Sequence, residues 1–194
     1  AIRDIESRVN LKLSGKRALV TGSTAGIGEA IARLLAAEGA SIAIHGRDEG
    51  RGNQLVDELK GSGTRTVFMK ADLSVPDEIV ALAEQARTAL GGVDVLVNNA
   101  GVLMNQRTTT AEGNETALAT NLLAPYLLTQ MLLPRLRESA PARIINVSSG
   151  GMYATGLALD DLQYEKSTYD GSRAYARTKR ALVTLTEMWA EQLQ

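Results

Sequence analysis

Two kinds of segment alternate along this chain, and their order predicts its fold. Short apolar runs, bounded by glycine or polar residues, recur at 16–21, 41–45, 66–69, 93–97 and 143–147. Segments with apolar residues at helical spacing lie between them. Strands this short and apolar are typical of a parallel sheet whose two faces are both covered by helices. The pattern predicts an α/β chain with a Rossmann-type doubly wound sheet, and no linker or repeat interrupts a single domain over 1–194.

The predicted helices carry recognisable end signals. The helix that follows residue 28 stops at Gly39, and the next covers 49–60. Ser74 with Asp77 has the spacing of a capping box and predicts the third helix, which ends at Gly91. A short surface helix is expected over 1–10. The last helix is expected over 172–194, a run without Gly or Pro.

The helix predicted over 115–137 is apolar nearly all round. Such a helix needs cover on more than its sheet side, either from deep burial in its own domain or from a partner subunit. Pro125 lies inside it, four residues after Asn121. Because proline lacks an N–H and its ring clashes with the carbonyl four residues earlier, a kink there would free the Asn121 carbonyl. The alternative is a tolerated helix proline.

Composition excludes several kinds of protein. The chain has 194 residues, 44% of them hydrophobic, and its formal net charge is −1, so neither nucleic acid nor an anionic membrane is an expected partner. It contains no cysteine and one histidine, His45, which argues against disulfides, a thiol nucleophile, a histidine-based metal site and a Ser-His-Asp triad. No apolar run reaches a membrane span and no secretory signal is evident, so we expect a cytoplasmic protein.

A glycine-rich turn joins the first strand to the first helix. It reads T-G-S-T-A-G-I-G over 21–28, with glycines at 22, 26 and 28. Glycines let the backbone approach a pyrophosphate, and the helix N-terminus supplies N–H donors and positive potential. This position, between a strand and a helix at the start of an alternating chain, predicts a dinucleotide site.

The residue at the end of the second strand indicates which nicotinamide cofactor binds. An acid there binds the ribose 2′-hydroxyl, whereas an arginine accommodates a 2′-phosphate. This chain has neutral Gly46 followed by Arg47, which can form a planar charged fork with phosphate. We therefore expect NADP, with NAD less favoured. Asp48 opposes this interpretation, and the alternative is that Arg47 is a solvated loop residue.

Tyr175 and Lys179 are four residues apart in the last predicted helix and so share one of its faces. A tyrosine pKa is ordinarily about 10, and a neighbouring positive charge favours the phenolate. The pair can thus exchange a proton with an alcohol or carbonyl oxygen. An isolated pair at this spacing is usually an ordinary feature of an amphipathic helix.

Six motifs in order change that judgement: T-G-S-T-A-G-I-G, Asp72-Leu73, N-N-A-G at 98–101, Asn121, N-V-S-S at 146–149 and Y-A-R-T-K at 175–179. Together they resemble the short-chain dehydrogenase/reductase family from about residue 13 to the end. The resemblance implies that Tyr175 is the general acid or base, that Lys179 lowers its pKa and binds the nicotinamide ribose, and that Ser149, rather than Ser148, binds the substrate oxygen. Asn121 is implied to hold a water in a proton relay that extends to Lys179.

The resemblance also implies a cofactor site in which Asp72 contacts the adenine. Its expected members are Gly22, Ser23, Thr24, Gly26, Ile27, Gly28, Arg47, Asp72, Leu73, Asn98, Ala100, Gly101, Tyr175 and Lys179. The leading hypothesis is an NADP-dependent oxidoreductase acting on a carbonyl or secondary alcohol. The alternatives are a catalytically inactive dinucleotide-binding regulatory or scaffolding protein and a Rossmann-like domain for another nucleotide. A homo-oligomer through the 115–137 and 172–194 helices is a further expectation.

Two features depart from the commonest family pattern. The stretch between Ser149 and Tyr175 is longer, which resembles the retinol-dehydrogenase-like branch and implies lipophilic alcohols or carbonyls as substrates. The chain also stops at Gln194, inside or just after the Tyr175 helix, so the C-terminal part of the fold is missing from it. The expectation is a longer parent chain, and the alternative is a truncated inactive form.

Overall fold

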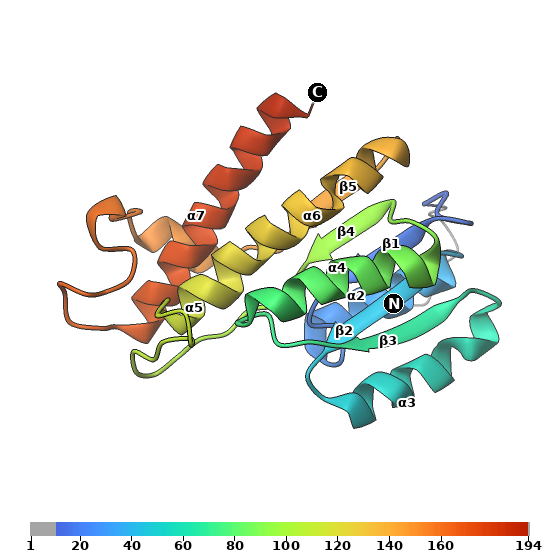
Figure 1. Ribbon diagram of the computed structural model, residues 1–194, viewed down its shortest axis with the longest axis horizontal. Coiled ribbons are helices and arrows are strands. Elements are labelled where there is room, and N and C mark those ends of the chain that lie inside the picture. Colours follow the sequence, from blue (N-terminus) through green and yellow to red (C-terminus); the bar gives the residue numbers. More distant parts are fainter. Residues whose placement is uncertain (1–10, 194) are drawn as a thin grey trace.

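The computed structural model describes residues 11–193, and a five-stranded parallel sheet lies at its centre (Figure 1). Its spatial order is β3-β2-β1-β4-β5, and every neighbouring pair is parallel. The strands are β1 (Arg17–Val20), β2 (Ser41–Gly46), β3 (Thr66–Lys70), β4 (Val95–Asn98) and β5 (Arg143–Asn146). The order reverses between β1 and β4, the place where open α/β sheets bind ligands. The predicted Rossmann-type fold is confirmed, while the helix expected over 1–10 lies outside the described residues.

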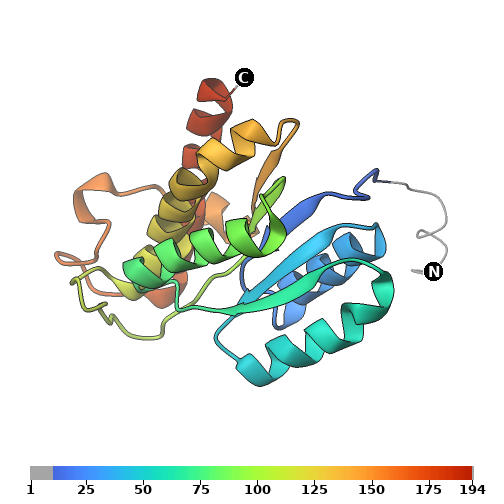
Figure 2. The same ribbon diagram turned by 45° about the vertical axis from the view of Figure 1, so that its right-hand side comes forward.

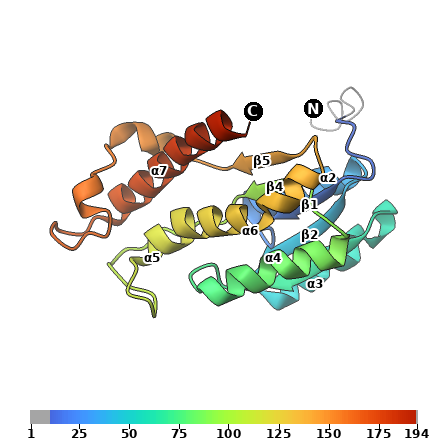
Figure 3. The same cartoon turned by 45° about the horizontal axis from the view of Figure 1, so that its top comes forward.

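Helices cover the sheet on both faces and complete two cores (Figure 2). Successive strand residues point to opposite faces, so Val20 of β1 packs with α2 (Gly26–Ala37) and α3 (Glu49–Leu59). Leu19 packs on the other face with α4 (Pro76–Leu90) and α6 (Ala124–Glu138), which lie side by side (Figure 3). The remaining elements are α5 (Thr116–Leu118), η1 (Lys60–Ser62), η2 (Ala119–Leu123), η3 (Gly150–Ala154), η4 (Leu159–Asp161) and α7 (Gly171–Gln192).

The helical cover of the sheet is incomplete at β5 within the described residues. Ile145, aligned with Val97 of β4 and on the same face, is 47% exposed. The core on that face is built from α2, α3 and strand residues of β1, β2 and β4. Among residues 11–193, no helix extends this core over β5, which leaves one face of the strand in contact with solvent.

The helix predicted over 115–137 is present but is not regular. Its middle turn, η2, is π-helical, and the N–H of Ala124 bonds to the carbonyl of Ala119, five residues back. The wider turn comes immediately before Pro125, where the sequence predicts an irregularity. The extra residue in this turn gives the proline ring room. Leu123, Tyr126 and Met131 remain partly exposed, so the described chain does not cover this helix completely. Burial by a partner subunit stays a prediction.

The capping prediction for α4 is wrong. The helix begins at Pro76, and its N-cap is Val75, which makes no side-chain cap bond. Ser74 instead donates its hydroxyl to Asp72 Oδ1 at 2.8 Å, and its N–H bonds to the same oxygen. Pro76 explains the shift, since proline suits the first helical position and has no N–H to be capped. The predicted end is correct: Gly91 adopts a left-handed conformation with φ +73°.

The expectation that no apolar run is long enough to span a membrane also needs correction. Among the described residues, one helical segment, Thr116–Glu138, is long and apolar enough by composition to cross a membrane. Its most apolar stretch is 56% buried within the protein, and buried core helices of soluble proteins have the same composition. The absence of a membrane partner and a cytoplasmic location both stay predictions.

Candidate functional site

A cavity of about 620 Å³ lies at the carboxyl ends of β1 to β4, where the order of the sheet reverses. Seven of the residues expected in a cofactor site line it: Gly22, Thr24, Arg47, Asp72, Leu73, Ala100 and Gly101. They come from four loops that are far apart in the sequence. Strand topology alone brings them together, because the carboxyl ends of parallel strands share one edge.

The glycine-rich loop is built so that its backbone can come close to its neighbours. Gly22 and Gly26 have φ values of +63° and +59°, which favour glycine. A Cβ on Gly28 would collide with the Gly22 carbonyl oxygen and with the Asn99 amide. Helix α2 starts at Gly26, and its N-cap, Ala25, offers no side-chain acceptor. The first N–H groups of α2 therefore have no side-chain cap and can bind an anion.

Asn99 fixes this loop from the end of β4. Its Nδ2 donates to the carbonyl oxygens of Thr21 and Gly22 at 2.9 and 3.1 Å, and its N–H bonds to Thr21 Oγ1. The sequence analysis did not assign a role to Asn99 by itself. The signal was present in N-N-A-G, since an asparagine directly after a buried strand can bond to neighbouring backbone.

His45 fixes the same loop from β2. Its Nδ1 accepts the Gly22 N–H at 3.1 Å, so the ring proton is on Nε2, which donates to the Ala71 carbonyl at 3.1 Å. The ring is buried, and this burial lowers its pKa to about 4 despite opposing effects from Ala71 and Asp72. A neutral ring is therefore part of the loop structure. In the sequence, the single histidine argues against a histidine-based metal site and a Ser-His-Asp triad, and it does not indicate this structural role.

Arg47 and Asp72 form the outer wall of the cavity. Arg47 Nη1 lies 3.7 Å from Asp72 Oδ2, and the arginine side chain is 70% exposed. Partial burial of Asp72 acts to raise its pKa, but bonds from the Ser74 N–H and hydroxyl, together with Arg47, hold the pKa below its ordinary value. Asp72 is thus an anion, and its loose pairing leaves Arg47 free to meet a phosphate.

Three expected cofactor residues are placed differently. The Ser23 hydroxyl is buried and donates to the Val20 carbonyl, while accepting the His45 N–H. Asn98 Nδ2 donates to Asn146 Oδ1 and Thr129 Oγ1. These two side chains support the loop and the sheet and do not line the cavity. That Ser23 and Asn98 contact the cofactor stays a prediction, and such contacts would have to come from their main-chain atoms. Ile27 lies in the first turn of α2 and is 68% exposed.

Helix α7 carries Tyr175 and Lys179 on one face, as their spacing predicts. The Lys179 Nζ lies 5.7 Å from the centre of the Tyr175 ring and donates to the Val147 carbonyl at 2.9 Å. Lys179 is only 2% exposed, and this burial lowers its pKa. Gly171 at the first turn of α7 packs against the Met104 carbonyl so closely that a Cβ would collide with it. This contact fixes the start of the helix that carries Tyr175.

The two serines after β5 are engaged differently. Ser148 donates its hydroxyl to the Lys179 carbonyl at 3.1 Å and contacts the Met152 sulfur. Ser149 Oγ accepts the Gly151 N–H at 3.3 Å, a bond that leaves the hydroxyl proton available to a ligand. The arrangement supports the choice of Ser149 over Ser148 as a donor, although no contact with a substrate tests it.

Asn121 joins α7 to the cavity. Its side chain bonds in both directions to the Val102 backbone, at 2.8 and 2.9 Å, and donates to Thr178 Oγ1 at 3.1 Å. A Cβ on Gly101 would lie 3.3 Å from Lys179 Nζ and 3.4 Å from Asn121 Oδ1. Gly101 itself lines the cavity, so the buried ammonium group lies next to this part of the wall. The water relay through the Asn121 carbonyl stays a prediction.

The long stretch between Ser149 and Tyr175 is anchored by residues that the sequence analysis missed. Glu115 is buried, caps α5 through the Ala117 and Leu118 N–H groups, and accepts the Tyr169 hydroxyl at 3.0 Å. Its own N–H bonds to Gln163 Oε1. These partners are 48 and 54 residues away along the chain, so no local pattern announces them.

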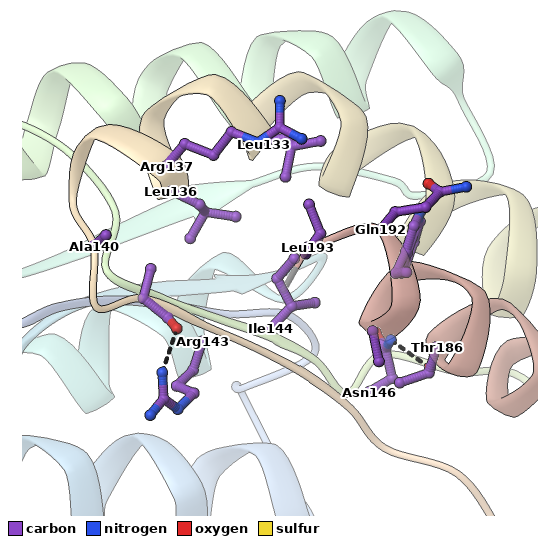
Figure 4. A pocket seen from close by; sticks show the side chains of 13 residues that line it. Leu133, Leu136, Arg137, Ala140, Arg143, Ile144, Asn146, Thr186, Gln192 and Leu193 are labelled. Atoms are coloured by element: carbon purple, nitrogen blue, oxygen red, sulfur yellow. Dashed lines mark hydrogen bonds between the residues drawn. The ribbon is translucent and has the colours of Figure 1, made fainter.

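A second cavity, of about 440 Å³, lies between β5 and the C-terminal parts of α6 and α7 (Figure 4). Leu136, Ile144, Trp189 and Leu193 are among its lining residues, and Asn146 bonds to Thr186 in its wall. None of the residues expected in the cofactor or catalytic site lines it. The candidate site is therefore the cavity at the carboxyl edge of the sheet.

Comparison with known proteins agrees with this architecture. Bovine (Bos taurus) dehydrogenase/reductase SDR family member 12 is 38% identical over 184 residues, 94% of this chain and 58% of that protein. Human (Homo sapiens) retinol dehydrogenase 12 is 40% identical over 189 residues, 96% of this chain and 60% of that protein. The chain therefore spans a little under two thirds of the length of these relatives.

Solved structures show the same similarity. A blue fluorescent protein from a metagenomic library, in complex with NADPH, superimposes with a TM-score of 0.78 and 34% identity, over 94% of this chain and 70% of that one. A metagenomic short-chain oxidoreductase in complex with NADP gives a TM-score of 0.75 and 34% identity, over 94% and 78%. The family described as short chain dehydrogenase matches residues 16–194. This chain belongs to the short-chain dehydrogenase family and is similar to its retinol dehydrogenases.

Proposed function

We propose that this chain forms part of an NADP-dependent oxidoreductase that interconverts a carbonyl compound and the corresponding alcohol. The observation that carries the proposal is the position of Gly101. It lines the cavity beside the glycine-rich loop, and a Cβ built on it would lie 3.3 Å from Lys179 Nζ and 3.4 Å from Asn121 Oδ1, so both side chains lie next to it. A dinucleotide site and a proton-transfer pair thus meet at one wall. A protein that only bound the dinucleotide would have no need for this connection.

The residues present suit NADP. The first N–H groups of α2 and the Gly22–Gly28 loop would hold the pyrophosphate, because these N–H groups have no side-chain cap. Arg47, exposed at the rim, would meet the 2′-phosphate, and Asp72 and Leu73 would flank the adenine. Lys179 would reach the nicotinamide ribose from α7. Two solved relatives contain NADPH and NADP, which supports the same choice.

The chemistry divides between the cofactor and the protein. NADPH, when bound, supplies the hydride that goes to the carbonyl carbon. Tyr175 would give its hydroxyl proton to the carbonyl oxygen, or accept it back when the alcohol is oxidised. Ser149, whose hydroxyl proton is available, would donate a hydrogen bond to the same oxygen. The positive Lys179, held 5.7 Å from the Tyr175 ring centre, would favour the phenolate that remains.

The substrate is proposed to be lipophilic. Leu103, Tyr153 and Leu159 are large apolar residues exposed on the two loops beside Gly101 and after Ser149. These loops gather at one end of the molecule, next to the start of α7 (Figure 1). Relatives named retinol dehydrogenase support an apolar alcohol or aldehyde. The exposed apolar residues of α6 support a homo-oligomer through α6 and α7, as a separate proposal.

Fluorescence titration of this chain with NADPH and with NADH tests the cofactor part of the proposal. NADPH should bind at least about tenfold more tightly, since one charged hydrogen bond to the 2′-phosphate is worth roughly 1.5–3 kcal/mol. ATP should compete weakly, because it lacks the 2′-phosphate and the nicotinamide. Equal displacement by ATP, or no binding of either dinucleotide, would contradict the proposal.

A further inference from the structure

We propose that Thr24 and Gly46 act as one steric unit that excludes an acidic residue from the end of β2 and so determines the choice of cofactor. The inference rests on the proposed function and concerns its 2′-subsite. A Cβ built on Gly46 lies 2.6 Å from both Thr24 Cγ2 and Thr24 Oγ1, and 3.2 Å from Thr24 Cβ. Both residues line the cavity next to Arg47.

Gly46 is not required here by its backbone. Its φ lies outside the left-handed region, unlike that of Gly22 or Gly26, so any L residue could adopt its conformation. The three atoms nearest to a Cβ built on Gly46 all belong to the Thr24 side chain. The Thr24 side chain on another loop is therefore the first obstacle to a side chain at 46.

Neither partner can move away easily. Gly46 is the last residue of β2 and is in register with Lys70 of β3. Thr24 belongs to the loop that His45 and Asn99 hold through Gly22. Both Thr24 Cγ2 and Thr24 Oγ1 face Gly46, so rotation of the side chain can turn one of these atoms away but leaves the other facing Gly46.

The consequence for specificity is direct. An acid at the end of the second strand selects NAD by binding the ribose 2′-hydroxyl. Here the first atom of such a side chain would occupy the space that Thr24 fills. Gly46 stays without a side chain, and Arg47 is left as the residue that faces the 2′-position. Cofactor choice then depends on Thr24 and Gly46 as well as on Arg47.

A double-mutant cycle tests this unit: the unmodified chain, Thr24→Gly, Gly46→Asp and the double variant. Thermal unfolding without any cofactor reports the clash itself. Titrations with NADPH and NADH report the specificity. Gly61→Asp is the control, because it adds the same carboxylate at a glycine that has no atom within 4 Å of a built Cβ.

Gly46→Asp alone should lower the unfolding midpoint by about 5 °C or more, or prevent folding, and should weaken both dinucleotides. The double variant should regain the stability of Thr24→Gly. It should also bind NADH at least about tenfold more tightly, relative to NADPH, than Thr24→Gly does. Gly61→Asp should behave as the unmodified chain does.

The proposal is overturned if Gly46→Asp is as stable as the control and gains NADH without help from Thr24→Gly. It is equally overturned if the double variant stays unfolded, or keeps its loss of stability, while Thr24→Gly folds. Failure of the unmodified chain to bind either dinucleotide would instead contradict the proposed function. The thermal cycle would still decide whether Thr24 and Gly46 form a steric unit.

Discussion

The Nζ atom of Lys179 donates a 2.9 Å hydrogen bond to the main-chain oxygen of Val147, so α7 is tied to the segment that leaves β5. Val147 is followed by Ser148 and Ser149, and Lys179 itself lies beside the Tyr175 ring. The buried ammonium group thereby fixes how α7, which carries Tyr175, lies relative to the end of β5, which leads to Ser149.

Lys179→Met should have a larger effect on the rate of catalysis than on the free energy of unfolding. Methionine fills a similar volume and takes a charge out of the interior, but leaves the Val147 oxygen without that donor, at a cost of about 1–3 kcal/mol. The rate of carbonyl reduction should fall at least about 100-fold, the smaller end of the range for proton-transfer groups. Lys166→Met is a matched control, because Lys166 also donates to a backbone carbonyl, that of Asp160, but on an exposed loop. Equal losses in both variants would contradict a specific role for Lys179.

Arg47→Asp should weaken NADPH far more than NADH, since it places a like charge where the 2′-phosphate is expected. A shift of at least about tenfold in the ratio of dissociation constants is expected from the loss of one charged hydrogen bond. Arg87→Asp, at the far end of α4, is the control for net charge. An unchanged ratio in the titrations would leave Arg47 as a solvated loop residue.

His45 should make the folded state sensitive to mild acid. Its pKa is about 4 in the folded chain against an ordinary 6.5, so the unfolded chain binds the extra proton first as the pH falls. The stability present above pH 6.5 is therefore lost progressively toward pH 4, by up to about 3 kcal/mol. The negative charge of Asp72 acts to raise the pKa of His45 and so makes this loss of stability smaller.

His45→Asn provides the comparison, because an asparagine oxygen can replace Nδ1 as the acceptor for the Gly22 N–H and does not titrate. Urea unfolding at pH 7 and pH 4.5 should show a larger loss in the unmodified chain than in the variant. Parallel losses in the two proteins would show that His45 does not titrate in this range.

Glu115→Ala should lower the free energy of unfolding by roughly 2 kcal/mol or more, because it removes an N-cap and leaves buried N–H groups without an acceptor. Tyr169→Phe removes one hydrogen bond to the same carboxylate and should cost roughly 1 kcal/mol. Burial and the nearby Glu115 both raise the pKa of Tyr169, so its hydroxyl stays a donor at neutral pH. Glu112→Ala, three residues earlier and exposed, is the control. A cost for Glu115→Ala no larger than for Glu112→Ala would refute the anchoring role.

The sequence predicts those features that depend on local periodicity. The strand–helix alternation predicts a parallel sheet with helices on its faces, and a four-residue spacing is enough to place Tyr175 and Lys179 on one side of α7. The position of Arg47 at the cavity follows from strand ends sharing an edge. Each of these results needs only the geometry of one element or of the parallel sheet.

Features that depend on distant partners were beyond reach. In the sequence, Glu115 is an ordinary acid at the start of a predicted helix, and its partners Tyr169 and Gln163 lie far along the chain. The role of His45 likewise depends on its bonds to Gly22 and Ala71. Ser74 has the spacing of a capping box, but the helix begins at Pro76 and the Ser74 hydroxyl donates to Asp72 instead. The open face of β5 depends on which helices lie over the strand in three dimensions, which strand composition does not report.

The most direct test of the proposed function is Tyr175→Phe, measured for both NADPH binding and carbonyl reduction over a panel of apolar aldehydes and ketones. The phenol hydroxyl is proposed to handle the proton and not to hold the cofactor, so the dissociation constant for NADPH should stay within about threefold. The reduction rate should fall at least about 100-fold, to the level of Lys179→Met or below. A variant that binds NADPH and retains near-normal turnover with phenylalanine at 175 would contradict the assignment of Tyr175 as the general acid.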